Sequence, residues 1–92
     1  MALGPINNYQ PRQGLATGTT AVTNITVTAS DGSTIATTDT IIAVLHISTA
    51  ASIATIANIT SEASITAAGI IQLSTTNTTS DQLWVFWHDS NI

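Results

Sequence analysis

Apolar and polar residues alternate with a period of two along much of this 92-residue chain. In residues 20–30, TAVTNITVTAS, one face carries Thr23, Ile25, Val27 and Ala29, and the other carries Val22, Asn24, Thr26 and Thr28. This alternation, with β-branched residues throughout, indicates a half-exposed strand. The next residues, SDGS at 30–33, place Asp31-Gly32 at the centre of a tight hairpin turn, and TIAT at 34–37 fits a short returning strand.

Two similar segments, DTIIAVLHIS at 39–48 and DQLWVFWHDS at 81–90, share an Asp, a His and a Ser at the same spacing. The first is apolar on both faces, which predicts a strand covered on both sides. The second predicts a strand with Leu83, Val85 and Trp87 on one face and Gln82, Trp84, Phe86 and His88 on the other. Two copies without a fixed period do not make a repeat architecture. We therefore interpret them as two equivalent strands, for which packing requirements explain the likeness at least as well as duplication.

The stretch EASITAAGIIQLS, residues 62–74, predicts a hairpin with arms at 64–67 and 70–74 and a turn at Ala68-Gly69. Residues 50–57 fit one or two helical turns and fit a strand about equally well, and residues 75–81 form a polar loop. Six to seven short strands with turns every 8–12 residues predict an all-β fold, a small antiparallel β-sandwich or barrel.

Residues 1–18 differ in composition from the rest of the chain. They contain both prolines and three of the five glycines, and their apolar residues show no regular period. They predict an extended N-terminal arm rather than a strand or helix, followed by a single β domain over residues 19–92. Such an arm is either disordered or ordered along a partner surface. In the second case Ile6, Tyr9 and Arg12 are the expected anchors.

The charge composition excludes several partners. The chain has no Lys, one Arg, five acidic residues and a net charge of -4. A single cation cannot release counterions from nucleic acid or hold an anionic membrane surface, so neither is an expected partner. The sequence contains no Cys, no secretory signal pattern and no run of about 18 apolar residues, and we expect synthesis in the cytoplasm without a signal peptide.

Catalytic chemistry finds little support in the sequence. His46 and His88 share a parity in their strands, so they are neighbours if those strands pair suitably, and with Asp39, Asp81 or Asp89 they could form a metal site or a His–carboxylate pair. However, a catalytic metal usually takes three protein ligands, and the nearest acids lie at strand ends. No nucleophile elbow or phosphate loop occurs. We expect no enzyme activity, no metal and no cofactor.

The aromatic residues are concentrated on one predicted strand. Trp84 and Phe86 face together and Trp87 faces the opposite way, so they cannot all point into one small core. The face of Trp84 and Phe86 is therefore either a contact surface or a second core layer.

The combination DTIIAVLHIS, ITSEASIT and GIIQLSTTNTTSDQLWVFWHD resembles small head decoration, or cement, proteins that tailed bacteriophages encode beside the major capsid protein. The resemblance spans roughly residues 35–90 and carries no functional-residue motif. It implies a β-rich virion protein that binds the outer surface of an icosahedral capsid and clamps neighbouring capsid subunits. The implied partners are the major capsid protein and further copies of the chain, with a trimer favoured.

Two other functions remain open on the sequence. One is a subunit of a phage fibre, tail or surface appendage. The other is a small carbohydrate-binding β module that uses Trp84 as a stacking platform. For the decoration function, Ile6, Tyr9, Arg12, Trp84 and Phe86 are the predicted partner contacts.

Overall fold

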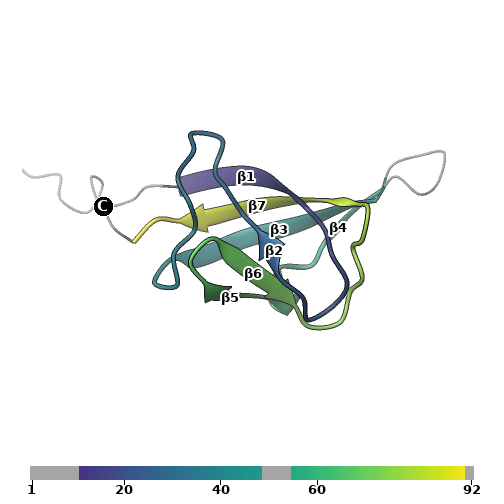
Figure 1. Cartoon of the computed structure of the whole chain (residues 1–92). Helices are drawn as coiled ribbons and strands as arrows, with labels where there is room; N and C mark the ends of the chain where they lie inside the picture. The colour runs from purple at the N-terminus through teal and green to yellow at the C-terminus, as the bar shows by residue number, and fades with distance from the viewer. Residues whose placement is uncertain (1–10, 49–54, 91–92) are drawn as a thin grey trace, which may run out of the picture.

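The computed structural model describes residues 11–48 and 55–90, which form two packed antiparallel sheets (Figure 1). The larger sheet has the strand order β1-β7-β3-β4 and the smaller has the order β2-β6-β5. The strands are β1 (Pro11–Thr17), β2 (Ile25–Thr26), β3 (Thr40–Ser48), β4 (Thr55–Asn58), β5 (Ala63–Ala67), β6 (Ile70–Leu73) and β7 (Gln82–His88), with one 3-10 turn, η1 (Thr60–Glu62). The all-β fold expected from the sequence is confirmed.

The two similar segments lie side by side at the centre of the larger sheet. β3 and β7 run antiparallel, with Thr40 opposite His88 and Ile47 opposite Gln82. A bulge between Ile41 and Ala43 adds one residue to β3. β1 covers the other edge of β7, and β4 covers the other edge of β3.

The core lies between the two sheets and is built by the alternation seen in the sequence. Leu83, Val85 and Trp87 point inward from β7, as expected from their parity. Ile25 and Val27 point inward from the opposite layer, although only Ile25–Thr26 has regular strand pairing. The buried apolar side chains are Ala16, Ile25, Val27, Ala29, Ile35, Val44, Ile71, Leu73, Leu83, Val85 and Trp87.

Both turns read from the sequence are present. Gly32 has a φ of 91° and Gly69 a φ of 76°, which is left-handed backbone that favours glycine. At the first turn, Asp31 Oδ1 accepts hydrogen bonds from the backbone N–H and the hydroxyl of Ser33. At the second, β5 and β6 pair as the expected hairpin.

The expectation of an extended arm over residues 1–18 is wrong for Pro11–Thr17. This stretch forms β1, pairs with β7 along its whole length and places Ala16 in the core. The strand was not recognised from the sequence because it contains proline and glycine, which are uncommon within sheets. The packing requires one of these glycines: a Cβ on Gly14 would lie 2.1 Å from the backbone oxygen of Thr28. Residues 1–10, and with them Ile6 and Tyr9, lie outside the described residues.

Two further expectations need correction. β3 is covered on one face only: Val44 is buried, whereas Ile42 is 45% exposed, because the bulge turns it away from the core. In the segment 50–57, the described residues from Thr55 onward form strand β4 rather than a helical turn, and residues 50–54 lie outside the described part. Across the described ranges, no helix is long and apolar enough to span a membrane.

Candidate functional site: the outer face of the four-stranded sheet

The outer face of the larger sheet carries a band of exposed apolar side chains. Directly opposed residues of antiparallel strands place their side chains on the same face. Leu15 of β1 and Leu45 of β3 therefore flank Trp84 of β7, and Ile47 of β3 lies beside Ile56 of β4. We define the outer band as Leu15, Leu45, Ile47, Ile56, Trp84 and Phe86.

Much of the outer band is open to solvent. Leu15 is 58% exposed, Ile56 is 65% exposed and Trp84 is 37% exposed. Their counterparts one position away on β1 and β7, such as Ala16 and Val85, are buried. β1 and β7 thus each have one face in the core and one face in solvent, and Leu15 and Trp84 lie on the solvent face.

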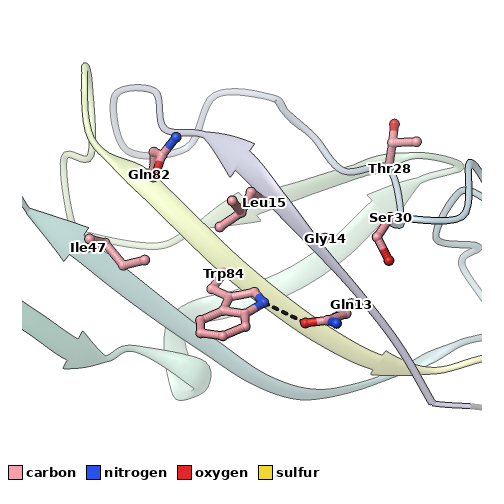
Figure 2. Close-up of a pocket in the computed structure, with 8 residues that line it drawn as sticks. All are labelled: Gln13, Gly14, Leu15, Thr28, Ser30, Ile47, Gln82 and Trp84. Carbon is pink, nitrogen blue, oxygen red and sulfur yellow. Dashed lines mark hydrogen bonds between the residues drawn. The ribbon is translucent and has the colours of Figure 1, made fainter.

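Trp84 is held in a fixed orientation at the middle of the outer band. Its Nε1–H donates a hydrogen bond to Oε1 of Gln13 at 2.8 Å, as Figure 2 shows. Its ring lies 5.0 Å from the ring of Phe86, at an interplanar angle of 37°. An indole fixed by a hydrogen bond and a ring contact loses little conformational freedom when a partner covers it.

Beside Trp84 the surface is hollowed by a shallow depression of about 590 Å³. Leu15, Ile47 and Trp84 supply its apolar walls (Figure 2). The full lining consists of Gln13, Gly14, Leu15, Thr28, Ser30, Ile47, Gln82 and Trp84. All these residues are uncharged, so the hollow suits an apolar side chain or a neutral ring.

The charged residues of the chain are occupied by contacts away from the outer band. Arg12 Nη1 pairs with Asp31, and its Nε and Nη2 donate to Asp89 Oδ2 at 3.3 and 3.2 Å. Its side chain is only 18% exposed. Arg12 therefore links β1 to the 30–33 turn and to the end of β7, and it is a structural residue in the described fold rather than the free anchor that the sequence suggested.

Hydrogen bonds from nearby hydroxyl and N–H groups lower the pKa values of two carboxylic acids. The carboxylate of Glu62 accepts from the hydroxyl and N–H of Thr76 and from the N–H of Thr75, which lowers the pKa of Glu62 to about 2. Hydrogen bonds from Ser33 and the nearby Arg12 cation lower the pKa of Asp31. Both carboxylates stay ionised and tie loops to the sheets.

Two Asp–His corners explain the likeness of the segments 39–48 and 81–90. Because β3 and β7 are antiparallel, the Asp before each strand meets the His near the end of the other. At one corner, His46 Nε2 lies 2.8 Å from Asp81 Oδ2. Asp81 lies at a strand end, as the sequence suggested, but it is nevertheless beside the imidazole of His46.

At the other corner, Asp39 accepts hydrogen bonds from the N–H of Ala36 and from the N–H and hydroxyl of Ser90. Burial alone would raise the pKa of Asp39, but these hydrogen bonds and the nearby His88 outweigh it, and the pKa is lowered. One end of the β3–β7 pair is thus fastened by His46 and Asp81, and the other by Asp39 and Ser90.

The two histidines are not neighbours. His46 is opposite Leu83, whereas His88 is opposite Thr40, six residues earlier on β3. Because of the bulge, that separation is five residue pairs along the ladder, or about 17 Å at the rise of a strand. In the described part of the chain no three His, Cys, Asp or Glu side chains gather where they could hold a metal ion.

The predicted contact residues thus have different places. Trp84 and Phe86 share the outer band, Arg12 lies in an ion-pair cluster, and Ile6 and Tyr9 are outside the described residues. Sequence reasoning missed Leu15 and Ile56. Only their positions in the alternating pattern of β1 and β4 could have indicated them, and these strands contain too few alternating residues to be recognised from the sequence.

No known protein family, no curated protein and no solved structure matches this chain. The function is therefore inferred from the outer band and from the contacts around it.

Proposed function

We propose that the chain is a structural protein that binds the outer surface of an icosahedral phage capsid through its outer band. The observation that carries this proposal is an apolar, uncharged face that crosses all four strands of one sheet and includes an oriented tryptophan. Exposed apolar patches rimmed by polar groups mark interaction sites, and tryptophan is enriched among the residues that dominate binding energy.

The rigidity of the face favours binding over catalysis. Every residue of the outer band lies on a strand, so its backbone is already ordered before a partner arrives. Burial contributes about 25 cal/mol per Å² of apolar area, from which the cost of ordering side chains is subtracted. Since the backbone is fixed in advance, little ordering cost remains at this face.

A capsid is the proposed partner because of the residues that resemble decoration proteins. They include β3 and β7, the central strands of the larger sheet, and β6 with its neighbour β5 in the smaller sheet. A modest contact repeated over many copies raises the barrier to shell rupture, which is a kinetic stabilisation. The contact needs no cation on the chain, because the outer band is uncharged.

Quantitative mass spectrometry of virus particles from the source tests this function. A ratio of the chain to the major capsid protein near one, or near a simple fraction, supports a shell component that clamps neighbouring subunits. A few copies per particle would move the protein to a fibre, tail or vertex. Absence from particles would refute the virion function altogether.

Binding measured across salt concentrations gives an independent check of the surface. A contact made by uncharged residues should keep its affinity between about 0.1 and 1 M salt, although the Debye length falls from about 10 to 3 Å. A steep loss of binding with salt would place the contact on Arg12 or on the acidic residues instead.

A carbohydrate-binding module is the second candidate, because the hollow beside Trp84 combines an aromatic wall with the amides of Gln13 and Gln82. A sugar ring stacked on the indole would change its fluorescence. In a Trp87→Phe variant only Trp84 emits, so titration with neutral oligosaccharides reports on this site directly. An unchanged emission spectrum would remove this candidate.

A further inference from the structure

The sheet edges differ in how far they are protected from pairing with another strand. The open edge of β1 is covered by residues 28–30: the N–H of Ser30 donates to the oxygen of Gln13 at 2.8 Å, and Gly14 packs directly against Thr28. β2 has only two residues, and β5 carries a bulge. Such covers, short strands and bulges prevent edge-to-edge association.

β4 is the other edge strand of the larger sheet, and its four residues contain no proline, no charge and no bulge. All four are exposed, and within the described residues β4 pairs with β3 alone. A regular, uncharged and exposed edge is a template for pairing with a further strand.

The pairing with β3 fixes which backbone groups of β4 face outward. The N–H of Ile59 donates to the oxygen of Val44 at 2.9 Å, so residue 59 turns its backbone toward β3. In an antiparallel ladder this orientation alternates. Ala57 therefore also turns toward β3, whereas the N–H and C=O groups of Ile56 and Asn58 point to the open edge.

We propose that β4 pairs antiparallel with β4 of a second copy of this chain, about a twofold axis at Ala57. In this register Ile56 of each copy lies opposite Asn58 of the other, and the outward groups of both residues form four hydrogen bonds. If the twofold axis lay at Ile56 or at Asn58 instead, only the residue at the axis would form these hydrogen bonds, with the same residue of the other copy.

The charge distribution allows a second copy at this edge, and the self-complementary register of β4 favours it. Two chains of net charge -4 repel each other over most of their surfaces, whereas β4 is uncharged. An edge that pairs with itself forms an isologous contact, which closes at two copies. The edge geometry thus points to a dimer rather than to the trimer implied by the resemblance.

Pairing at β4 also extends the outer band. Ile56 belongs to the band and to β4, so joining two four-stranded sheets places two bands on one continuous face. This consequence rests on the proposed function: a dimer would present twice the contact area to a capsid and bind two equivalent places at once. Linked contacts of this kind raise the overall affinity without any new type of contact.

A single introduced cysteine tests the pairing, because the chain has none of its own. At the proposed axis, Ala57 faces its equivalent in a non-hydrogen-bonded pair, with Cα atoms about 4.5 Å apart, within the range of a disulfide. The variant Ala57→Cys should form a covalent dimer under mild oxidation at least about tenfold faster than Ala68→Cys, since pairing gives the thiols a high effective concentration. Ala68 is also exposed but lies at the β5–β6 turn.

Two substitutions at Ile56 in the Ala57→Cys chain separate backbone pairing from side-chain contact. Ile56→Pro removes an outward N–H and no bond to β3, so cross-linking should fall to the rate of Ala68→Cys. Ile56→Ala keeps the N–H and should retain most of the rate. Circular dichroism verifies that each variant is folded, and the comparison of Ala57→Cys with Ala68→Cys decides the matter even if the proline variant unfolds.

Equal cross-linking rates at residues 57 and 68 would overturn the pairing, as would a trimer in sedimentation equilibrium of the unmodified chain. The measurement uses the purified chain without capsids, so its failure leaves the proposed function standing. Conversely, a chain that cross-links at residue 57 but is absent from virus particles keeps the pairing and refutes the function.

Discussion

Replacing each tryptophan of β7 with alanine compares the two faces of one strand. Trp84→Ala and Trp87→Ala remove the same atoms three positions apart, one from the outer band and one from the core. Trp87 is 1% exposed, whereas Trp84 is 37% exposed. Trp87→Ala should therefore lose much more stability than Trp84→Ala. Trp84→Ala should instead lose more of its affinity for the partner.

The expected magnitudes follow from burial. A fully buried tryptophan replaced by alanine costs about 3–5 kcal/mol, because a cavity adds to the lost burial. A domain of this size has about 5–14 kcal/mol in total, so Trp87→Ala removes a large part of it. Trp84→Ala should cost about 1–2 kcal/mol, since its loss leaves an open surface rather than a closed cavity.

Urea unfolding followed by far-ultraviolet circular dichroism measures both costs. With a slope of about 1–1.5 kcal/mol per M, Trp87→Ala should lower the midpoint by about 2–5 M and Trp84→Ala by at most about 2 M. Each variant keeps one tryptophan, so fluorescence gives a second, local probe of the same transition. Coincident transitions by the two probes establish two-state unfolding.

Equal losses of stability in the two variants would refute this reasoning. Such a result would mean that the face of Trp84 is a second core layer, covered by part of the chain, and not a contact surface. A Trp84→Ala variant that stays folded but binds its partner as well as the original chain would refute the outer band as the binding face.

Three further outcomes test the contacts that hold the fold. Hydrogen bonds, led by those from Thr76, lower the pKa of Glu62 from 4.5 to about 2, so its contribution to stability is present above pH 4.5 and is lost as the pH falls toward 2. Glu62→Gln should therefore weaken the fall of the melting temperature in this pH range, and an unchanged fall contradicts the role given to Glu62. Gly18→Ala places a Cβ 2.1 Å from the backbone oxygen of Thr78 and should cost at least about 1–3 kcal/mol in urea unfolding, where a neutral effect would show that the loop yields. Deletion of residues 1–18 removes β1 and should abolish the cooperative transition in circular dichroism, whereas its persistence would show that β1 is dispensable.

Two kinds of feature could be predicted from short stretches of the sequence: the hairpin turns and the two faces of β7. The hairpin turns at Gly32 and Gly69 follow from turn chemistry, and the two faces of β7 follow from strict alternation. β1 could not be predicted in this way. Gly14 reads as a loop residue, but its role is to let the backbone of Thr28 approach, and this contact with a later segment of the chain is not visible in the local sequence.

The site was predictable only in its central part. The parity of β7 placed Trp84 and Phe86 on one face, but which strands flank them depends on sheet order. Leu15 joins them because β1 pairs with β7, a contact between segments about 70 residues apart. The Asp–His corner of His46 and Asp81 likewise depends on β3 and β7 being antiparallel neighbours, which no local pattern specifies.

Rebinding of the purified chain to virus particles stripped of it tests the central claim most directly. The variant Leu15→Glu places a charge in the outer band, and Thr66→Glu places the same charge on exposed β5 of the other sheet. The account predicts that Thr66→Glu co-sediments with particles like the original chain, while Leu15→Glu loses at least about tenfold in affinity, or about 1.4 kcal/mol. Equal binding by the two folded variants would contradict the assignment of the outer band as the capsid-binding face.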